Sequence, residues 1–153
     1  IMHNALKLNQ VSRMAQVCIR DVSHAEMEFA ERDGRIIQFS DFAVSNHLFA
    51  GGNWFELSRD IVNCLPQKVY ISFDIDGLDP SCCPNTGTPV AGGISPDAAM
   101  YLIRMVAESG REIIGADLCE VAPGTDEWDA GNGARILYRT AVLIQHSHQP
   151  TIA

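Results

Sequence analysis

Three aspartates leave the end of a strongly apolar stretch, residues 69–73. Asp74 and Asp76 are two residues apart, so on an extended backbone their side chains face the same side. Carboxylates brought together repel one another, and they must either point into water or meet a cation. Two carboxylates at the end of a buried strand suit a hard divalent cation of the manganese or magnesium type, and a solvated loop is the alternative. Asp79 precedes Pro80 and is expected to be a turn residue that binds local N–H groups.

Alternating strands and helices must position these aspartates. The sequence predicts strands at 15–19, 35–40, 68–73 and 112–121, helices at 2–8, 23–34, within 41–65, at 95–110 and 134–145, and a frayed tail at 146–153. The strand at 68–73 is apolar on both faces, which is typical of a sheet covered from both sides. Alternation with short connections predicts an α/β fold with a largely parallel sheet. Ligands in such folds bind beyond the carboxyl ends of the strands.

Two helix starts are marked by capping residues. Ser23 followed by Glu26 is a capping-box pattern, in which the acid satisfies the N-cap amide. Ser95 followed by Pro96 is typical of an N-cap and a first helical residue. Glu26 is therefore interpreted as a capping residue rather than as a substrate ligand.

The composition limits the classes of function. The chain has 153 residues and a net charge of −8, which argues against a nucleic-acid partner. No apolar stretch approaches the length of a membrane span, so no membrane partner is expected. The five cysteines are odd in number and include an adjacent pair, which predicts reduced thiols and a cytoplasmic location.

A long motif follows the strand at 68–73. Ser72, Asp74, Asp76, Asp79 and Pro80 are followed by Thr-Gly-Thr-Pro at 86–89, by Gly-Gly at 92–93 and by Leu-Cys-Glu-Val-Ala-Pro at 118–123. This series resembles the ureohydrolase family of arginase, agmatinase and formimidoylglutamase, over the chain from about residue 15 to the final helix. The resemblance implies a three-layer α-β-α sandwich with a mainly parallel sheet. Cys18 stands where the family usually has a glycine.

The resemblance also implies the chemistry. Ureohydrolases hydrolyse a guanidino or formimino C–N bond with two Mn²⁺ ions, and Asp74 and Asp76 match metal ligands. Glu120 would hold the guanidinium and Thr88 would lie near the substrate, so both are candidate catalytic and substrate-binding residues. A carboxylate fork suits a planar cation, and paired metals activate water near neutral pH. Each residue has an alternative interpretation that stays open: for Thr88 it is bonding within its own turn, and for Glu120 it is pairing with a surface arginine.

The chain departs from the family in one large respect. The family takes its other metal ligands from a Gly-Gly-Asp-His and an Asp-Ala-His-x-Asp segment, and neither occurs here. Residues 1–153 are therefore expected to be the C-terminal part of a single ureohydrolase domain, without the N-terminal half. Because each ion needs more donors than two carboxylates offer, this chain alone is predicted to have an incomplete manganese site and no activity.

The expected substrate is a small cationic guanidino compound. Arginases have an acid where Ser23 stands, and a serine cannot pair with an α-ammonium group. The full-length protein is thus expected to convert agmatine to putrescine and urea in polyamine metabolism, with arginase, guanidinobutyrase or formimidoylglutamase activity as alternatives. A non-catalytic scaffold or partner subunit is the alternative of another class. The family implies a homo-oligomer (trimer or hexamer), or a complex with the missing half.

Overall fold

The computed structural model describes residues 1–149 and shows alternating helices and strands. The elements are α1 (Met2–Ala5), β1 (Met14–Ile19), α2 (His24–Arg32), β2 (Ile36–Ser40), α3 (Asp41–Phe49), α4 (Trp54–Asn63), β3 (Lys68–Asp74), the 3-10 turns η1 (Ile75–Gly77) and η2 (Pro80–Cys82), α5 (Pro96–Glu108), β4 (Glu112–Cys119) and α6 (Trp128–Ser147). The end of the expected frayed tail, 150–153, lies outside the described residues.

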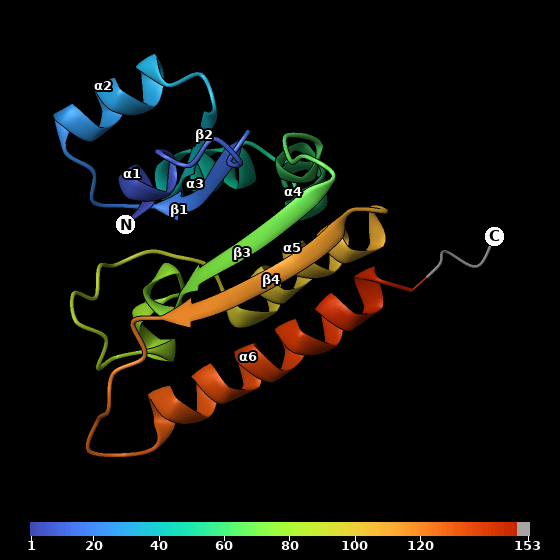
Figure 1. Ribbon diagram of the computed structural model, residues 1–153. Helices are drawn as coiled ribbons and strands as arrows, with labels where there is room; N and C mark the ends of the chain where they lie inside the picture. The colour runs from blue at the N-terminus through green and yellow to red at the C-terminus, as the bar shows by residue number, and fades with distance from the viewer. Residues whose placement is uncertain (150–153) are drawn as a thin grey trace.

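The strands form two parallel pairs, which confirms the predicted parallel α/β arrangement. β1 pairs with β2, and β3 pairs with β4. Within residues 1–149 no backbone ladder joins the two pairs, so the expected single sheet is present as two separate two-stranded sheets. Figure 1 shows β1 and β2 grouped with α1 to α4, and β3 and β4 grouped with α5 and α6.

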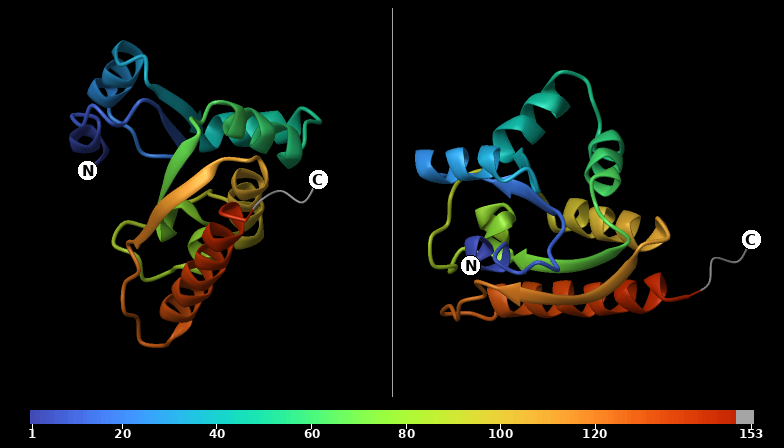
Figure 2. Two further views of the ribbon diagram at one scale, coloured as in Figure 1. Left: turned by 45° about the vertical axis from the view of Figure 1, so that its right-hand side comes forward. Right: turned by 45° about the horizontal axis from the view of Figure 1, so that its top comes forward.

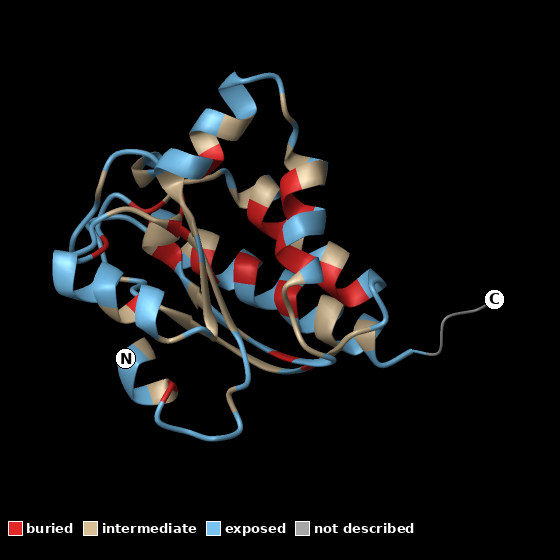
Figure 3. Cartoon of the chain, turned by 90° about the horizontal axis from the view of Figure 1, so that it is seen from above, coloured by how far each residue is buried: buried red, intermediate tan, exposed pale blue. Residues whose placement is uncertain are grey.

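Helices α5 and α6 pack on the same side of the β3–β4 pair (Figures 1 and 2). The main core contains Val69, Ile103, Val106, Ile113 and Ile136, drawn from both strands and both helices. Burying these aliphatic side chains supplies the main driving force that holds the layers together. Figure 3 shows the buried positions gathered on packed helices, with loops and outer helix faces exposed.

The opposite face of β3 is open, so the expectation that this strand is covered from both sides is wrong for this chain. Tyr70, Ser72 and Asp74 alternate along β3 and are all exposed, with Tyr70 56% exposed. The helices cover only the alternate positions, and no other part of residues 1–149 packs over the open face. The polar end of the strand is thus free to serve as a site.

Both predicted helix starts are confirmed. Ser23 and Glu26 form a complete capping box on α2, and the Ser95 hydroxyl accepts the Ala98 N–H at the start of α5, with Pro96 in the first turn. None of the helices in the described part of the chain combines the length and apolarity that crossing a bilayer requires. All five cysteines are free.

Three element boundaries differ from expectation. α1 ends at Ala5, and α6 begins at Trp128 rather than at residue 134. Gly131 and Gly133 made this segment look like a loop, but Gly133 is buried, and a Cβ there would lie 3.0 Å from Val121. The glycine serves close packing inside the helix. β4 ends at Cys119, because Glu120 adopts a left-handed backbone with φ 62°.

Candidate metal and substrate site

The two candidate metal ligands flank a buried anchor residue. Asp74 is the last residue of β3, and the chain turns directly into η1, which carries Asp76. Ile75 between them is fully buried and packs into the main core. The turn, rather than the extended spacing assumed from the sequence, therefore sets the relation of the two carboxylates.

The acids at this end of the sheet lie close enough to affect one another. Partial burial, followed by the charges of Asp76, Glu120 and Asp117, raises the pKa of the Asp74 carboxyl above its usual value. Like charges that are crowded disfavour ionisation, and a cation placed among them would reverse that effect. The structure thus places Asp74, Asp76 and Glu120 at the same end of the β3–β4 pair, and their roles stay predictions.

Carboxylate oxygens are donors that suit Mn²⁺. The donor set is nevertheless partial: across residues 1–149 there is no group of three or more histidine, cysteine, aspartate or glutamate side chains placed to hold a metal ion. Asp74 and Asp76 fit two manganese ligands, but a complete site needs donors from outside this set.

Glu120 is held in a strained conformation at the end of β4. Its φ of 62° lies in the left-handed region, which L side chains rarely adopt. The Thr86 hydroxyl donates a hydrogen bond of 2.9 Å to the Glu120 carbonyl oxygen. The carboxylate then lies over the loop, with Oε2 3.6 Å from the position that a Cβ on Gly87 would occupy. Strain of this kind persists where surrounding contacts impose it.

Thr88 is exposed on the loop that carries Thr86. Its neighbour Thr86 is buried and is the residue that joins the loop to Glu120. Thr86 was part of the motif, yet its positioning role was not predicted from the sequence. The roles of Thr88 and Glu120 toward a substrate stay predictions.

Sequence reasoning missed Asp117, which lies beside Ser72 in the parallel register. The Ser72 hydroxyl donates to Asp117 Oδ1 at 2.9 Å, and the Cys119 thiol lies 3.5 Å from the same oxygen. The interaction with Asp117 also raises the pKa of Tyr70. The alternation of polar residues at 117 and 119 on β4 was the available signal, because alternate residues share a face.

Asp129 was missed because it lies where a loop was expected. This carboxylate is 1% exposed and accepts hydrogen bonds from Asn85 N at 3.0 Å and Asn85 Nδ2 at 3.1 Å. Trp128 Nε1 donates to the Ser81 carbonyl oxygen at 3.0 Å. These contacts fix the start of α6 to the loop that precedes Thr86.

Two further acids, Asp79 and Glu26, have the local roles that the sequence predicted. Asp79 Oδ1 accepts the Ser81 N–H at 2.9 Å, which confirms it as a turn residue. Glu26 Oε2 accepts the Ser23 N–H at 2.8 Å, which confirms it as a capping residue.

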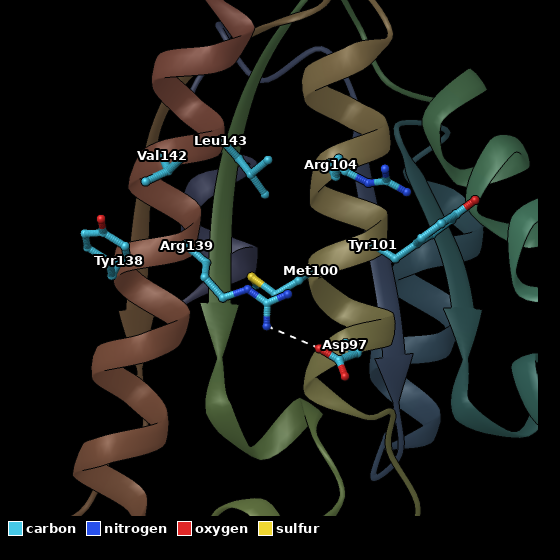
Figure 4. A pocket seen from close by; sticks show the side chains of 8 residues that line it. All are labelled: Asp97, Met100, Tyr101, Arg104, Tyr138, Arg139, Val142 and Leu143. Carbon is cyan, nitrogen blue, oxygen red and sulfur yellow. Dashed lines mark hydrogen bonds and ion pairs between the residues drawn. The ribbon is translucent and has the colours of Figure 1, made fainter.

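A shallow groove elsewhere in the molecule is separate from the acidic site. It has a volume of about 400 Å³ and lies between α5 and α6, where Figure 4 shows Arg139 reaching toward Asp97. Its lining includes Met100, Tyr101 and Tyr138, and it contains none of the predicted site residues. The side chains that line this groove are mainly apolar, aromatic and basic, unlike the carboxylates at the ends of β3 and β4.

Comparisons with known proteins identify the family of this chain. The profile of the Arginase family matches residues 1–143. An agmatinase of Proteus mirabilis is 48% identical over 71 residues, which cover 46% of this chain and 22% of that protein. The match thus spans about a fifth of the relative's length.

Solved structures share the fold. A hypothetical agmatinase from Burkholderia thailandensis is 30% identical, with a TM-score of 0.74 over 94% of this chain and 43% of that one. The proclavaminate amidino hydrolase of Streptomyces clavuligerus is 22% identical, and its TM-score of 0.79 over 96% of this chain and 48% of that one shows a shared fold. Because the family profile matches residues 1–143 of this chain, the chain belongs to the arginase family.

Proposed function

We propose that the protein to which this chain belongs is a ureohydrolase that converts agmatine to putrescine and urea. The observation that supports the proposal is that β3 and β4 pair in parallel, so that Asp74, Asp76 and Glu120 lie at or just beyond the same end of this strand pair. The similarity to agmatinases, at 48% identity over 71 residues in one relative, supports this substrate class.

Each residue has a distinct role in the proposal. Asp74 and Asp76 supply carboxylate ligands to a manganese pair, which when bound supplies Lewis-acid activation of water. Glu120 holds the planar guanidinium through its two carboxylate oxygens, and its strained backbone fixes the direction in which they point. Thr88 lies on the loop that carries Thr86, and it contacts the substrate from its exposed position.

Ser23 bears on arginine recognition, because it stands where arginases have an acid. Its hydroxyl donates to Glu26 Oε2 at 2.7 Å and accepts from Glu26 N at 3.3 Å, so the side chain is occupied in the cap of α2. A neutral, locally bonded hydroxyl offers no charge partner for an α-ammonium group. Agmatine lacks the α-carboxylate of arginine but keeps a terminal ammonium group in place of the α-ammonium, so the proposal of agmatine rests on the similarity to agmatinases rather than on Ser23.

The remaining donors come from outside this chain. Solved neighbours match over 43% and 48% of their lengths, which supports a chain that forms the C-terminal part of a larger ureohydrolase domain. We propose further that the whole protein binds the complete manganese pair. It assembles as a trimer or hexamer and has a cytoplasmic location. The exposed face of β3 is where the missing half would pack.

Two measurements test the proposal. The first is an activity panel on the whole protein with agmatine, arginine, guanidinobutyrate and formiminoglutamate, in which urea and formamide are quantified. We expect urea from agmatine; formamide as the main product would eliminate the agmatine assignment. Asp74→Asn and Asp76→Asn should each abolish activity, whereas the matched Asp97→Asn, in an exposed pair with Arg139, should not.

The second measurement is titration of the 153-residue chain with Mn²⁺ by calorimetry. We expect weak binding, because the described residues offer only part of a donor set. Tight binding of two ions to this chain alone would contradict the proposal that the remaining metal ligands come from outside the chain. A whole protein that binds no manganese and hydrolyses none of the four substrates would favour a scaffold or partner-subunit role.

A further inference from the structure

The acidic loop is bonded to the other strand pair, although the two sheets share no ladder. Arg20 follows β1, and its Nη2 donates a hydrogen bond to the Asp76 carbonyl oxygen. Its Nη1 lies 3.4 Å from the Gly77 carbonyl oxygen. The guanidinium therefore holds the backbone of η1 and binds neither carboxylate, so that both acids stay available.

The far end of the same loop is held by a carboxylate. Asp41, the first residue of α3, accepts the Gly93 N–H at 2.8 Å through Oδ1. Charge-assisted hydrogen bonds of this kind are stronger than bonds between neutral groups. The loop that begins after Asp74 is thus fixed at its start by Arg20 and at its end by Asp41.

The Gly-Gly pair of the loop is fitted to these two side chains. Gly92 and Gly93 have φ values of 104° and 87°, which favour glycine. A Cβ on Gly92 would lie 2.6 Å from Asp41 Oδ2, and one on Gly93 would lie 2.5 Å from the Leu78 carbonyl oxygen and 2.7 Å from Arg20 Nη1. Glycine at both positions allows the backbone to approach the charged groups closely.

We infer that Arg20 and Asp41 are positioning residues that form a clamp on the loop at 75–93. By fixing both ends of the loop, the clamp sets where Asp76 stands beside Asp74. The link to metal binding rests on the proposed function, whereas the ordering of the loop does not. Neither residue contacts a predicted ligand carboxylate, so their effect on the site acts through the backbone.

Hydrogen exchange of the 153-residue chain tests the clamp. Arg20→Met removes both donors and Asp41→Ala removes the acceptor. We expect peptides within 75–94 to exchange at least tenfold faster in each variant, while those from β3 and α5 stay within twofold of the wild type. Arg104→Met and Asp97→Ala are matched controls on the surface of α5, and Asp97, like Asp41, lies in the first turn of its helix.

Loop exchange within twofold of the wild type in both variants would overturn the clamp, and so would equal acceleration throughout the chain. Arg20→Lys is the milder variant if Arg20→Met does not fold, because it keeps the charge and N–H donors but lacks the rigid planar fork of the guanidinium. It should accelerate exchange three- to tenfold, within the loop alone. No acceleration in that variant would count against the inference.

Manganese affinity of the whole protein separates positioning from simple stabilisation. Arg20→Met and Asp41→Ala should raise the Mn²⁺ Kd at least fivefold, and Arg20→Lys should restore much of the loss. An unchanged Kd with a loosened loop would refute the positioning role. If the wild-type protein binds no manganese, the proposed function fails, and the loop exchange still decides whether the clamp exists.

Discussion

Glycine at position 120 should stabilise the chain relative to alanine, although the same change removes the proposed guanidinium ligand. Glu120 has φ 62° and its side chain is exposed, so its replacement sacrifices little packing. A left-handed conformation costs an L residue roughly 1–2 kcal/mol. This cost remains in the alanine variant and is absent in the glycine variant. Both variants equally remove the Glu120 charge that acts on Asp74.

The expected size follows from two opposing terms. Glycine gains roughly 1–2 kcal/mol from relief of strain, and it loses about 0.4–1 kcal/mol because its unfolded chain is more flexible. The net expectation is that Glu120→Gly is about 0.5–1 kcal/mol more stable than Glu120→Ala. This margin is large enough to resolve as a difference in denaturation midpoint.

Urea denaturation of both variants, followed by circular dichroism, measures this difference. Glu31 provides the control, since it is exposed near the end of α2, where the backbone is helical. There glycine should be less stable than alanine by up to about 1 kcal/mol. If glycine were also the less stable residue at position 120, the strain assigned to Glu120 would be refuted.

Three further changes test the site. Asp74→Asn should stabilise the metal-free chain at pH 7, because burial and like charges raise the folded pKa of Asp74. This gain in stability should vanish below the unfolded pKa of 3.8, where the carboxyl is neutral in both states. Thermal melts at pH 7 and pH 3 measure the difference. Asp129→Ala should lower the unfolding free energy by about 2–3 kcal/mol in urea, since the N–H and Nδ2 donors of Asn85 lose their buried carboxylate acceptor. Thr86→Val should lower it by about 1–2 kcal/mol and, in the whole protein, raise KM for agmatine, because the Glu120 carbonyl loses its donor; an unchanged KM would argue against this positioning role.

Local features of the fold were readable from the sequence. The capping box of Ser23 and Glu26 and the cap at Ser95 depend on residues within one helical turn, and the structure confirms both. The start of α6 was not readable. Gly131 and Gly133 disfavour a helix by intrinsic propensity, and contacts of the first turn with the loop at 81–86 overcome that preference.

The candidate site residues stay predictions. The motif and the strand end pointed to Asp74, Asp76 and Glu120, because parallel strands bring their carboxyl ends to one edge. Their supporting residues were not predicted. Arg20 and Asp41 act on a loop more than 50 residues away in sequence (|i−j| of 56 and 52), and no local pattern encodes such a contact.

Cys18 illustrates what the sequence and the structure each show about one position. The sequence showed that a cysteine replaces the glycine usual in the family, and the structure gives the reason for that usual glycine: the residue has φ 61° at an irregularity in the β1–β2 ladder. Its side chain is 4% exposed in a small core with Val44, Leu57 and Ile61, and this packing opposes the backbone strain.

The sequence alone predicted candidate residues for the chemistry and determined most of the helical and extended segments, because side-chain type, capping and periodicity act within a few residues. Only the tertiary structure decided that β3 has an open face, that Glu120 is strained, and that Arg20 reaches the acidic turn. Those features depend on which distant groups fill the space around a residue, and the free energies of packing and long-range hydrogen bonding outweigh local preference there.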